Sequence, residues 1–170
     1  MQMTIRKTTA KDIDAVLKIF EDAKAYMLAN GIDQWQKGYP NRETILRDIE
    51  TSVGYVLTEG NEVLASAALF LGTPDPTYQK IYQGKWLSDA PYGTIHRVAV
   101  KKDQKGKRLA SILMASLENT IREQGLASVR IDTHRDNLPM RRHLQKDGYQ
   151  QCGIIHLLDG DERIAFEKLL

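Results

Sequence analysis

The stretch that decides the fold is TIHRVAVKKDQKGKRLAS, residues 94–111. It begins as an apolar strand, passes through a short basic turn that holds Gly106, and opens directly into a segment with helical spacing. The first turn of a helix presents N–H groups without intrahelical partners and a partial positive charge, so it attracts anions. The lysines and the arginine of residues 105–108 strengthen the same field. The stretch therefore predicts a site for a phosphate-bearing ligand at residues 105–111.

The composition of the whole chain is that of an ordinary globular protein. Its 170 residues are 42% apolar and 27% charged. The net charge of +2 is too small to favour nucleic acid as a partner. One cysteine, Cys152, excludes an intramolecular disulfide and favours a reducing compartment, and the histidines are too scattered for a metal site. Because the chain lacks both a membrane-spanning run and the apolar core of a signal peptide, we expect one cytoplasmic domain over residues 3–170.

Periodic patterns place helices and strands along the chain. Helices are expected after Thr9, after Asn41 and over residues 106–124 and 138–147. Strands are expected over residues 3–7, 54–58, 62–71, 94–100, 129–133, 150–158 and 162–168. The strand–helix–strand unit around residues 94–133 implies parallel neighbours, and two hairpins imply antiparallel ones. The fold class is α+β: a mixed, mostly antiparallel sheet of about seven strands with a central parallel pair, flanked by about four helices.

The irregular segment 72–92 interrupts this pattern with three prolines and several aromatic residues. A short helix around residues 76–84 is compatible with its sequence. Long insertions in compact domains are usually functional, so the segment is a candidate for ligand contact. The hairpin at the C-terminal end offers a sheet edge at which a homodimer can form.

The order of these elements and two motifs resemble the GNAT superfamily of acetyl-CoA-dependent N-acetyltransferases. The family turn reads Gln/Arg-x-x-Gly-x-Gly/Ala, and here Lys105, Arg108 and Ala110 stand at its three defining positions. Arg108 departs from the family's central glycine. The second motif, Asn, a short helix and Gly-Phe/Tyr, is matched by Asn137 and by Gly148-Tyr149. The resemblance covers nearly the whole chain.

The resemblance implies a cofactor, acetyl-CoA, and a place for it. In the family, the strand at 95–100 splays from the strand at 127–133, and acetyl-CoA lies in the gap. Its pantetheine arm pairs with the backbone of Val98 and Val100, its pyrophosphate rests on the amides of residues 105–110, and a substrate amine attacks the thioester directly. The cofactor-binding residues implied are Val98, Ala99, Val100, Lys105, Gly106, Lys107, Arg108, Leu109, Ala110, Ser111 and Asn137.

His96 is the candidate catalytic base. Some family members place a base on this strand, and an imidazole, whose ordinary pKa is about 6.5, suits proton removal from an amine near neutral pH. A histidine that merely packs beside the strand is an equally weighted interpretation, and the neighbouring Arg97 is interpreted as structural. The family's general acid, a tyrosine four residues before the motif glycine, is replaced by Leu144. We therefore expect water or another group to protonate the leaving thiolate.

The acceptor is expected to meet aromatic residues of the irregular segments, because the equivalent loops of the family wall the acceptor site. The candidates for substrate binding are Trp35, Tyr39, Tyr82 and Trp86. For each of them, packing of the loop onto the core is the competing interpretation. Two other constellations carry weaker hypotheses: a histidine–carboxylate pair of Asp132 with His134, and a buried free thiol at Cys152.

Two functions remain open at this level. The first is acetyl transfer from acetyl-CoA to a primary amine of a small molecule or peptide. The alternative is a non-catalytic acyl-CoA-binding or sensing domain. It stays open because Leu144 replaces the family's tyrosine and Arg108 replaces its central glycine. A P-loop hydrolase is disfavoured because Gly-x-x-x-x-Gly-Lys-Ser/Thr is absent, and a helix-turn-helix DNA binder is disfavoured by the strand content.

Overall fold

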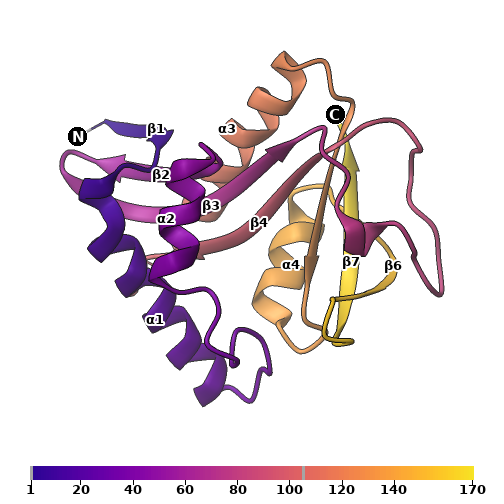
Figure 1. Cartoon of the computed structure of the whole chain (residues 1–170), viewed down its shortest axis with the longest axis horizontal. Coiled ribbons are helices and arrows are strands. Elements are labelled where there is room, and N and C mark those ends of the chain that lie inside the picture. Colours follow the sequence, from indigo (N-terminus) through magenta and orange to yellow (C-terminus); the bar gives the residue numbers. More distant parts are fainter. Residues whose placement is uncertain (1, 105) are drawn as a thin grey trace. The chain divides into compact units, whose positions relative to one another are not determined.

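The computed structural model describes residues 2–104 and 106–170. Helices and strands follow one another in the predicted order (Figure 1). The helical elements are the 3-10 turns η1 (Ala10–Asp12) and η2 (Pro76–Tyr78) and the helices α1 (Ile13–Ala29), α2 (Arg42–Glu50), α3 (Leu109–Glu123) and α4 (Leu138–Lys146). The strands are β1 (Met3–Lys7), β2 (Gly54–Glu59), β3 (Glu62–Leu71), β4 (Gly93–Val100), β5 (Ser128–Thr133), β6 (Gln150–His156) and β7 (Glu162–Leu169).

The strands form one seven-stranded sheet in the order β1-β2-β3-β4-β5-β7-β6. β4 and β5 are parallel, whereas β1 with β2, β2 with β3, β5 with β7 and β6 with β7 are antiparallel. The parallel ladder is short and joins Gly93 to Val129 and Thr94 to Arg130. The mixed sheet with a central parallel pair confirms the predicted fold class. None of the helices in residues 2–104 and 106–170 is long and apolar enough to cross a membrane.

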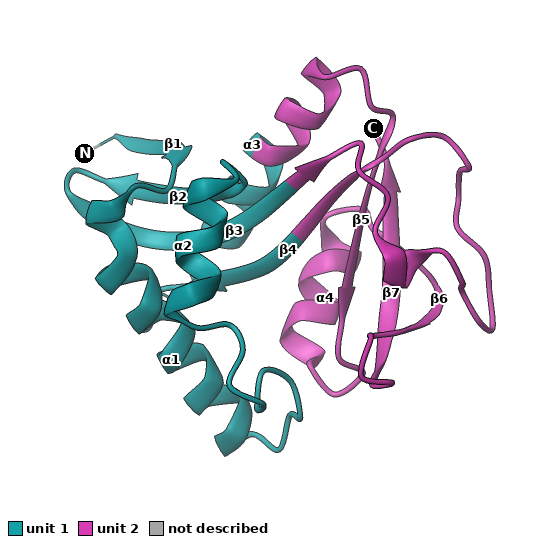
Figure 2. Cartoon of the chain, viewed as in Figure 1, with its two compact units in different colours: residues 1–69, 96–116 teal, residues 70–95, 117–170 magenta. Residues whose placement is uncertain are grey.

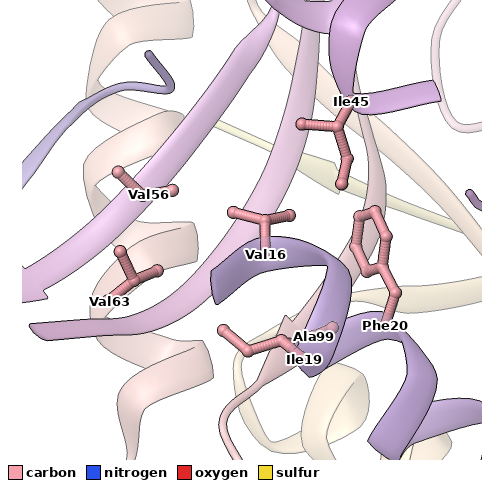
Figure 3. Packing of buried hydrophobic residues seen from close by; sticks show 7 residues of the cluster. All are labelled: Val16, Ile19, Phe20, Ile45, Val56, Val63 and Ala99. Atoms are coloured by element: carbon pink, nitrogen blue, oxygen red, sulfur yellow. The ribbon is translucent and has the colours of Figure 1, made fainter. Parts of the chain in front are cut away.

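The chain forms two compact units, drawn in different colours in Figure 2. Unit 1 comprises residues 1–69 and 96–116, and unit 2 comprises residues 70–95 and 117–170. The core of unit 1 forms where the apolar faces of α1 and α2 meet side chains of β2, β3 and β4 (Figure 3). Its buried members are Val16, Ile19, Phe20, Ile45, Val56, Val63 and Ala99.

Unit 2 holds the irregular segment 72–92. Its helical part is only the 3-10 turn η2, shorter than the helix considered for residues 76–84, because the chain turns away to pair with β6. Tyr82 and Ile154 exchange two backbone hydrogen bonds of 2.8 Å, and Lys85 N donates to Cys152 O at 3.0 Å. A Cβ atom at Gly84 would lie 1.8 Å from Cys152 O, so this close approach requires glycine. The outer edge of β6, on which the dimer prediction relied, is thus occupied around residues 152–154.

Asp12 joins the first strand to the first helix of unit 1. Its carboxylate accepts hydrogen bonds from Arg6 Nη1 and Nη2 at 2.7 and 3.0 Å, and from Thr9 N and Oγ1 at 2.8 and 3.1 Å. The bonds from Arg6, the largest cause, and those from Thr9 lower the pKa of Asp12, although burial opposes them. The folded protein therefore favours the ionised carboxylate more than the unfolded chain does.

We expect Asp12→Asn to destabilise the protein at pH 7 by about 1.5–3 kcal/mol, because the variant loses hydrogen bonds to a charged group. A lowered native pKa gives stability that is present above the ordinary carboxyl pKa of about 3.9 and is lost as pH falls through the native value. The difference in the free energy of unfolding between the two proteins should therefore shrink from pH 7 to pH 3, as measured by urea unfolding. Asp22→Asn, in the exposed Lys18–Asp22 pair, is the control and should show almost no such change.

Candidate functional site

The predicted strand and helix on either side of the basic turn are β4 and α3, and the described residues of the turn belong to unit 1. β4 is held at its end by a hydrogen bond from Lys101 N to Leu64 O at 2.8 Å. The first helical hydrogen bond of α3 runs from Ile112 N to Arg108 O at 3.0 Å. The amides of residues 109–111 precede that bond, so they form the N-terminal turn of a 15-residue helix that follows basic residues. The arrangement suits an anion.

Three residues of this turn have left-handed backbones: Asp103 with φ 69°, Gly106 with φ 83° and Arg108 with φ 56°. Glycine adopts this conformation without strain, whereas a residue with a Cβ pays about 1–2 kcal/mol. The positive φ of Arg108 is compatible with the glycine that the resemblance implies at this position, and Arg108 adopts it at the cost of backbone strain. Gly106, Lys107 and Arg108 are all exposed, and Lys105 lies outside the described residues.

The other predicted cofactor residues of this turn differ in what they can offer a ligand. Leu109 is buried in the core, so only its backbone amide is available. Ala110 and Ser111 are half-buried in the first turn of α3. On β4, Val98 and Val100 are half-buried, whereas the Ala99 side chain packs into the unit 1 core. For Leu109 and Ala99 a cofactor contact is therefore restricted to the main chain.

His96 and Arg97 are neighbours on β4 with different surroundings. His96 is half-buried. Arg97 has φ 57° in the middle of the strand, and its Nη1 and Nη2 atoms donate to Asp48 of α2 at 2.6 and 2.9 Å. Burial lowers the pKa of Arg97, but hydrogen bonds to Asp48 and Tyr39 outweigh burial and raise it above the ordinary value. The contacts of Arg97 are those of the structural residue that the sequence suggests, while the proton-transfer role of His96 stays a prediction.

In unit 2, Asn137 caps α4. Its side-chain Oδ1 accepts from Met140 N at 3.3 Å, and its backbone oxygen accepts from Arg141 N at 3.0 Å. The side chain is buried, because it fills the end of the helix. The structure thus gives Asn137 a local role as the N-cap of α4. A contact of Asn137 with a cofactor stays a prediction.

Two buried tyrosines, Tyr149 and Tyr78, direct their hydroxyl protons to carboxylates. Tyr149 donates to Glu118 at 2.7 Å, and burial together with that carboxylate raises its pKa far above the ordinary value. Tyr78 is buried in the same way against Asp132, at 2.6 Å, with its pKa raised by burial and by the carboxylate. Leu144, where the family has a tyrosine, is completely buried.

The same contacts bear on the two weaker hypotheses. Asp132 accepts from the Tyr78 hydroxyl at 2.6 Å, and His134 Nδ1 accepts from Asp136 N at 3.0 Å. β5 ends at Thr133, and the pair of Asp132 with His134 stays a prediction. Cys152 is a buried free thiol, as expected, and burial raises its pKa.

The four acceptor candidates fall in both units. In unit 1, Trp35 packs edge-on against Phe20 at 5.8 Å between ring centres, and Tyr39 is 50% exposed with its ring 5.8 Å from the guanidinium of Arg97. In unit 2, Tyr82 is exposed beside His156, with ring centres 4.9 Å apart. Trp86 is half-buried between Tyr78 and Arg130. Tyr39 and Tyr82 thus keep accessible rings, while Trp35 and Trp86 are half-buried in contacts with their neighbours. Contact of any of the four with an acceptor stays a prediction.

No group of three or more metal-ligating side chains gathers among residues 2–104 and 106–170. One buried pair that the sequence does not predict is Arg97 with Asp48, which are 49 positions apart. The only sequence signal for this pair is a positively charged residue, Arg97, within a strand and next to the candidate base His96.

Comparison with known proteins agrees with this geometry. The model of the acetyltransferase (GNAT) family matches residues 15–149. A GNAT-family acetyltransferase from Streptococcus agalactiae is 37% identical, with a TM-score of 0.88 over 99% of this chain and 95% of its own. The PaiA N-acetyltransferase from Thermoplasma acidophilum, solved in complex with coenzyme A, is 14% identical, with a TM-score of 0.75 over 100% of both chains. No curated protein matches this chain.

The sheet order with its central parallel pair is that of the GNAT acetyltransferase fold, as the TM-score with the streptococcal protein shows. The chain belongs to the GNAT acetyltransferase family, since the family model spans most of it and the streptococcal protein is 37% identical over nearly its whole length.

Proposed function

We propose that this protein transfers the acetyl group of acetyl-CoA to a primary amine of a small molecule or peptide. The observation that carries the proposal is the turn between β4 and α3, which is basic, left-handed at Gly106 and Arg108, and followed directly by the first-turn amides of a helix. Such a turn fits a pyrophosphate. The coenzyme A bound by the PaiA relative supports the same ligand class here.

Acetyl-CoA supplies an acyl group activated as a thioester. The amine nitrogen forms a bond to the acyl carbon while the carbon–sulfur bond breaks, in a ternary complex without an acyl-enzyme. His96 takes the proton that the amine must lose. The amide of Val98 donates to the thioester oxygen as negative charge develops there. The leaving thiolate takes its proton from water, because Leu144 is apolar and Tyr149 is buried on Glu118.

The proposed binding groups come from the turn, from β4 and from two exposed aromatic residues. Lys107 and Arg108 offer exposed cations to the phosphates of the cofactor, together with Lys105, and the amides of residues 109–111 offer hydrogen bonds. Val98 and Val100 offer backbone groups that can pair with the pantetheine arm as an added strand does. Tyr39 and Tyr82 offer exposed rings to the acceptor.

Two measurements test the proposal. Calorimetry with acetyl-CoA, CoA and ATP should show binding of both CoA species and weaker binding of ATP, and failure of both CoA species to bind would overturn it. Thiol release over a panel of amino acids, polyamines, aminoglycosides and peptides should then identify an acceptor, with the acetylated product confirmed by mass spectrometry. Cys152→Ser is a suitable background control for a thiol reagent, because Cys152 is the one cysteine.

The alternative, a sensing domain that binds acyl-CoA without turnover, is favoured by the buried Leu144 at the position of the family's acid. The same two measurements separate the proposals. Binding without thiol release for any amine of the panel would favour the sensor, and release that depends on one class of amine would exclude it.

Arg108 gives a prediction with two readouts. Relative to Arg108→Ala, Arg108→Gly should raise the free energy of unfolding by about 1 kcal/mol, because glycine relieves the left-handed strain. Both variants lose the guanidinium, so both should bind CoA more weakly and with a smaller salt dependence than the wild type. Urea unfolding and calorimetry at two salt concentrations measure the two effects. Equal stability of the two variants would contradict the strained backbone, and unchanged CoA affinity would remove Arg108 from the phosphate site.

A further inference from the structure

Arg97 carries two energetic costs at one position. Its backbone is left-handed, with φ 57°, in the interior of a strand. Its Nε atom is buried and has no hydrogen-bond partner among the described residues. Arginine is not a residue that favours this backbone, and buried donors are normally satisfied. Strain of this kind persists only where the surrounding structure enforces it, and it gathers at functional sites.

The enforcing contact comes from α2. The Asp48 carboxylate accepts hydrogen bonds from both Nη atoms of Arg97. The pair is buried, since only 8% of the Arg97 side chain and 12% of the Asp48 side chain are exposed. Asp48 is itself tied to the residue that precedes β2, because its backbone oxygen accepts from Val53 N at 2.9 Å. Tyr39 adds a ring contact on the guanidinium at 5.8 Å. The Arg97 side chain is therefore fixed to a helix and a loop of unit 1 that precede β4 by about 50 residues in sequence.

The backbone of residue 97 sets the direction of the next peptide group. Side chains of a regular strand alternate between faces, but His96, Arg97 and Val98 are all half-buried, so the alternation is interrupted there. An irregular residue of this kind bends a strand and re-aims the groups beside it. The two groups beside Arg97 are the His96 side chain and the Val98 amide, which the proposed function assigns to the proton and to the thioester oxygen.

We propose that Arg97 is a positioning residue of the acetyl-transfer reaction: its bond to Asp48 holds β4 in the left-handed turn that aims His96 and the Val98 amide at the acyl group. The inference rests on the proposed function. Loss of the bond lets residue 97 relax toward an extended backbone, which moves both groups. A misplacement of about 1 Å near the reacting atoms can cost about 100-fold in rate.

The test separates the ion pair from the backbone conformation that it holds. Asp48→Asn and Arg97→Ala should lower kcat by about 10- to 100-fold, while acetyl-CoA affinity stays near that of the wild type. Arg97→Gly removes the same side chain but tolerates a positive φ, so it should keep about tenfold more turnover than Arg97→Ala. Arg97→Lys, which keeps a charge for Asp48, should recover part of the loss.

Asp14→Asn is the matched control. Like Asp48, Asp14 pairs with an arginine: its partner is Arg42 of α2, at 2.8 Å. Unlike Asp48, 90% of the Asp14 side chain is exposed. Its kcat should equal that of the wild type. Melting temperatures measured on all variants identify a merely structural role, in which stability falls while kcat at saturating substrates is unchanged. That result, or equal kcat for Arg97→Gly and Arg97→Ala, would overturn the proposal.

A second readout does not depend on turnover. Hydrogen exchange of the β4 amides in the CoA-bound protein should become faster around residues 96–98 in Asp48→Asn and remain unchanged in Asp14→Asn. If the wild type binds CoA but acetylates no amine, the proposed function fails and the positioning role fails with it, while the exchange result still reports whether Asp48 holds the strand. Unchanged exchange in Asp48→Asn together with unchanged kcat would contradict the positioning role alone.

Discussion

Replacement of His96 by alanine is expected to lower kcat by about 10²- to 10⁴-fold, the usual contribution of a positioned general base. The acetyl-CoA affinity should be nearly unchanged, because the binding groups proposed for the cofactor lie at residues 98–111. A base on β4 also produces an acid limb in the pH–rate profile, where protonation of the base removes activity. That limb should disappear in His96→Ala.

The measurements are steady-state kinetics across pH and calorimetry with acetyl-CoA. His96→Gln is the matched control, because glutamine preserves much of the side-chain volume but cannot take up the proton; it should be as slow as the alanine variant. Full activity of His96→Gln with low activity of His96→Ala would show that His96 acts through packing. Unchanged turnover in both variants near neutral pH would assign proton removal to another group or to water.

The fold and the basic turn between β4 and α3 are predictable from sequence for a local reason. Each helix and strand carries its own periodicity, and the order of these patterns fixes where parallel and antiparallel neighbours arise. The turn is predictable because a strand, a glycine and a basic helix start adjoin one another in residues 94–111. The backbone strain at Arg108 is not predictable from sequence, because a residue with a Cβ gives no local sign of a positive φ.

The contacts that fix β4 and the irregular segment are not predictable from sequence. Arg97 pairs with Asp48 and Arg130 with Glu167, across 49 and 37 positions. Charged residues usually mark solvent-exposed faces, so a pattern of polarity argues against the burial that these pairs undergo. Only tertiary packing brings such partners together, and the same is true of the segment around Tyr82 that pairs with β6.

The buried pair in unit 2 holds the irregular segment in place. Glu167 on β7 is completely buried, and its Oε1 accepts from Leu87 N at 2.8 Å. Its Oε2 accepts from Ser128 Oγ at 2.7 Å and from Arg130 Nε at 3.3 Å. The guanidinium of Arg130 lies 4.1 Å from the ring centre of Trp86 and 4.0 Å from that of Tyr92, and donates to Ser88 O at 2.6 Å. Backbone groups of residues 87 and 88 are thus attached to one ion pair.

Glu167→Gln is therefore expected to cost about 3–5 kcal/mol of folding free energy, because it leaves the charge of Arg130 buried without a counter-ion. The segment 72–92 should loosen first. Urea unfolding measures the free energy, limited proteolysis within residues 79–91 measures the loosening, and Trp86 fluorescence reports its contact with Arg130. Glu162→Gln is the matched control: it lies on the same strand and pairs with Arg135 at 2.8 Å, but both side chains are more than half exposed. It should cost less than about 1 kcal/mol, and an equally small loss for Glu167→Gln would show that the buried ion pair does not hold the segment.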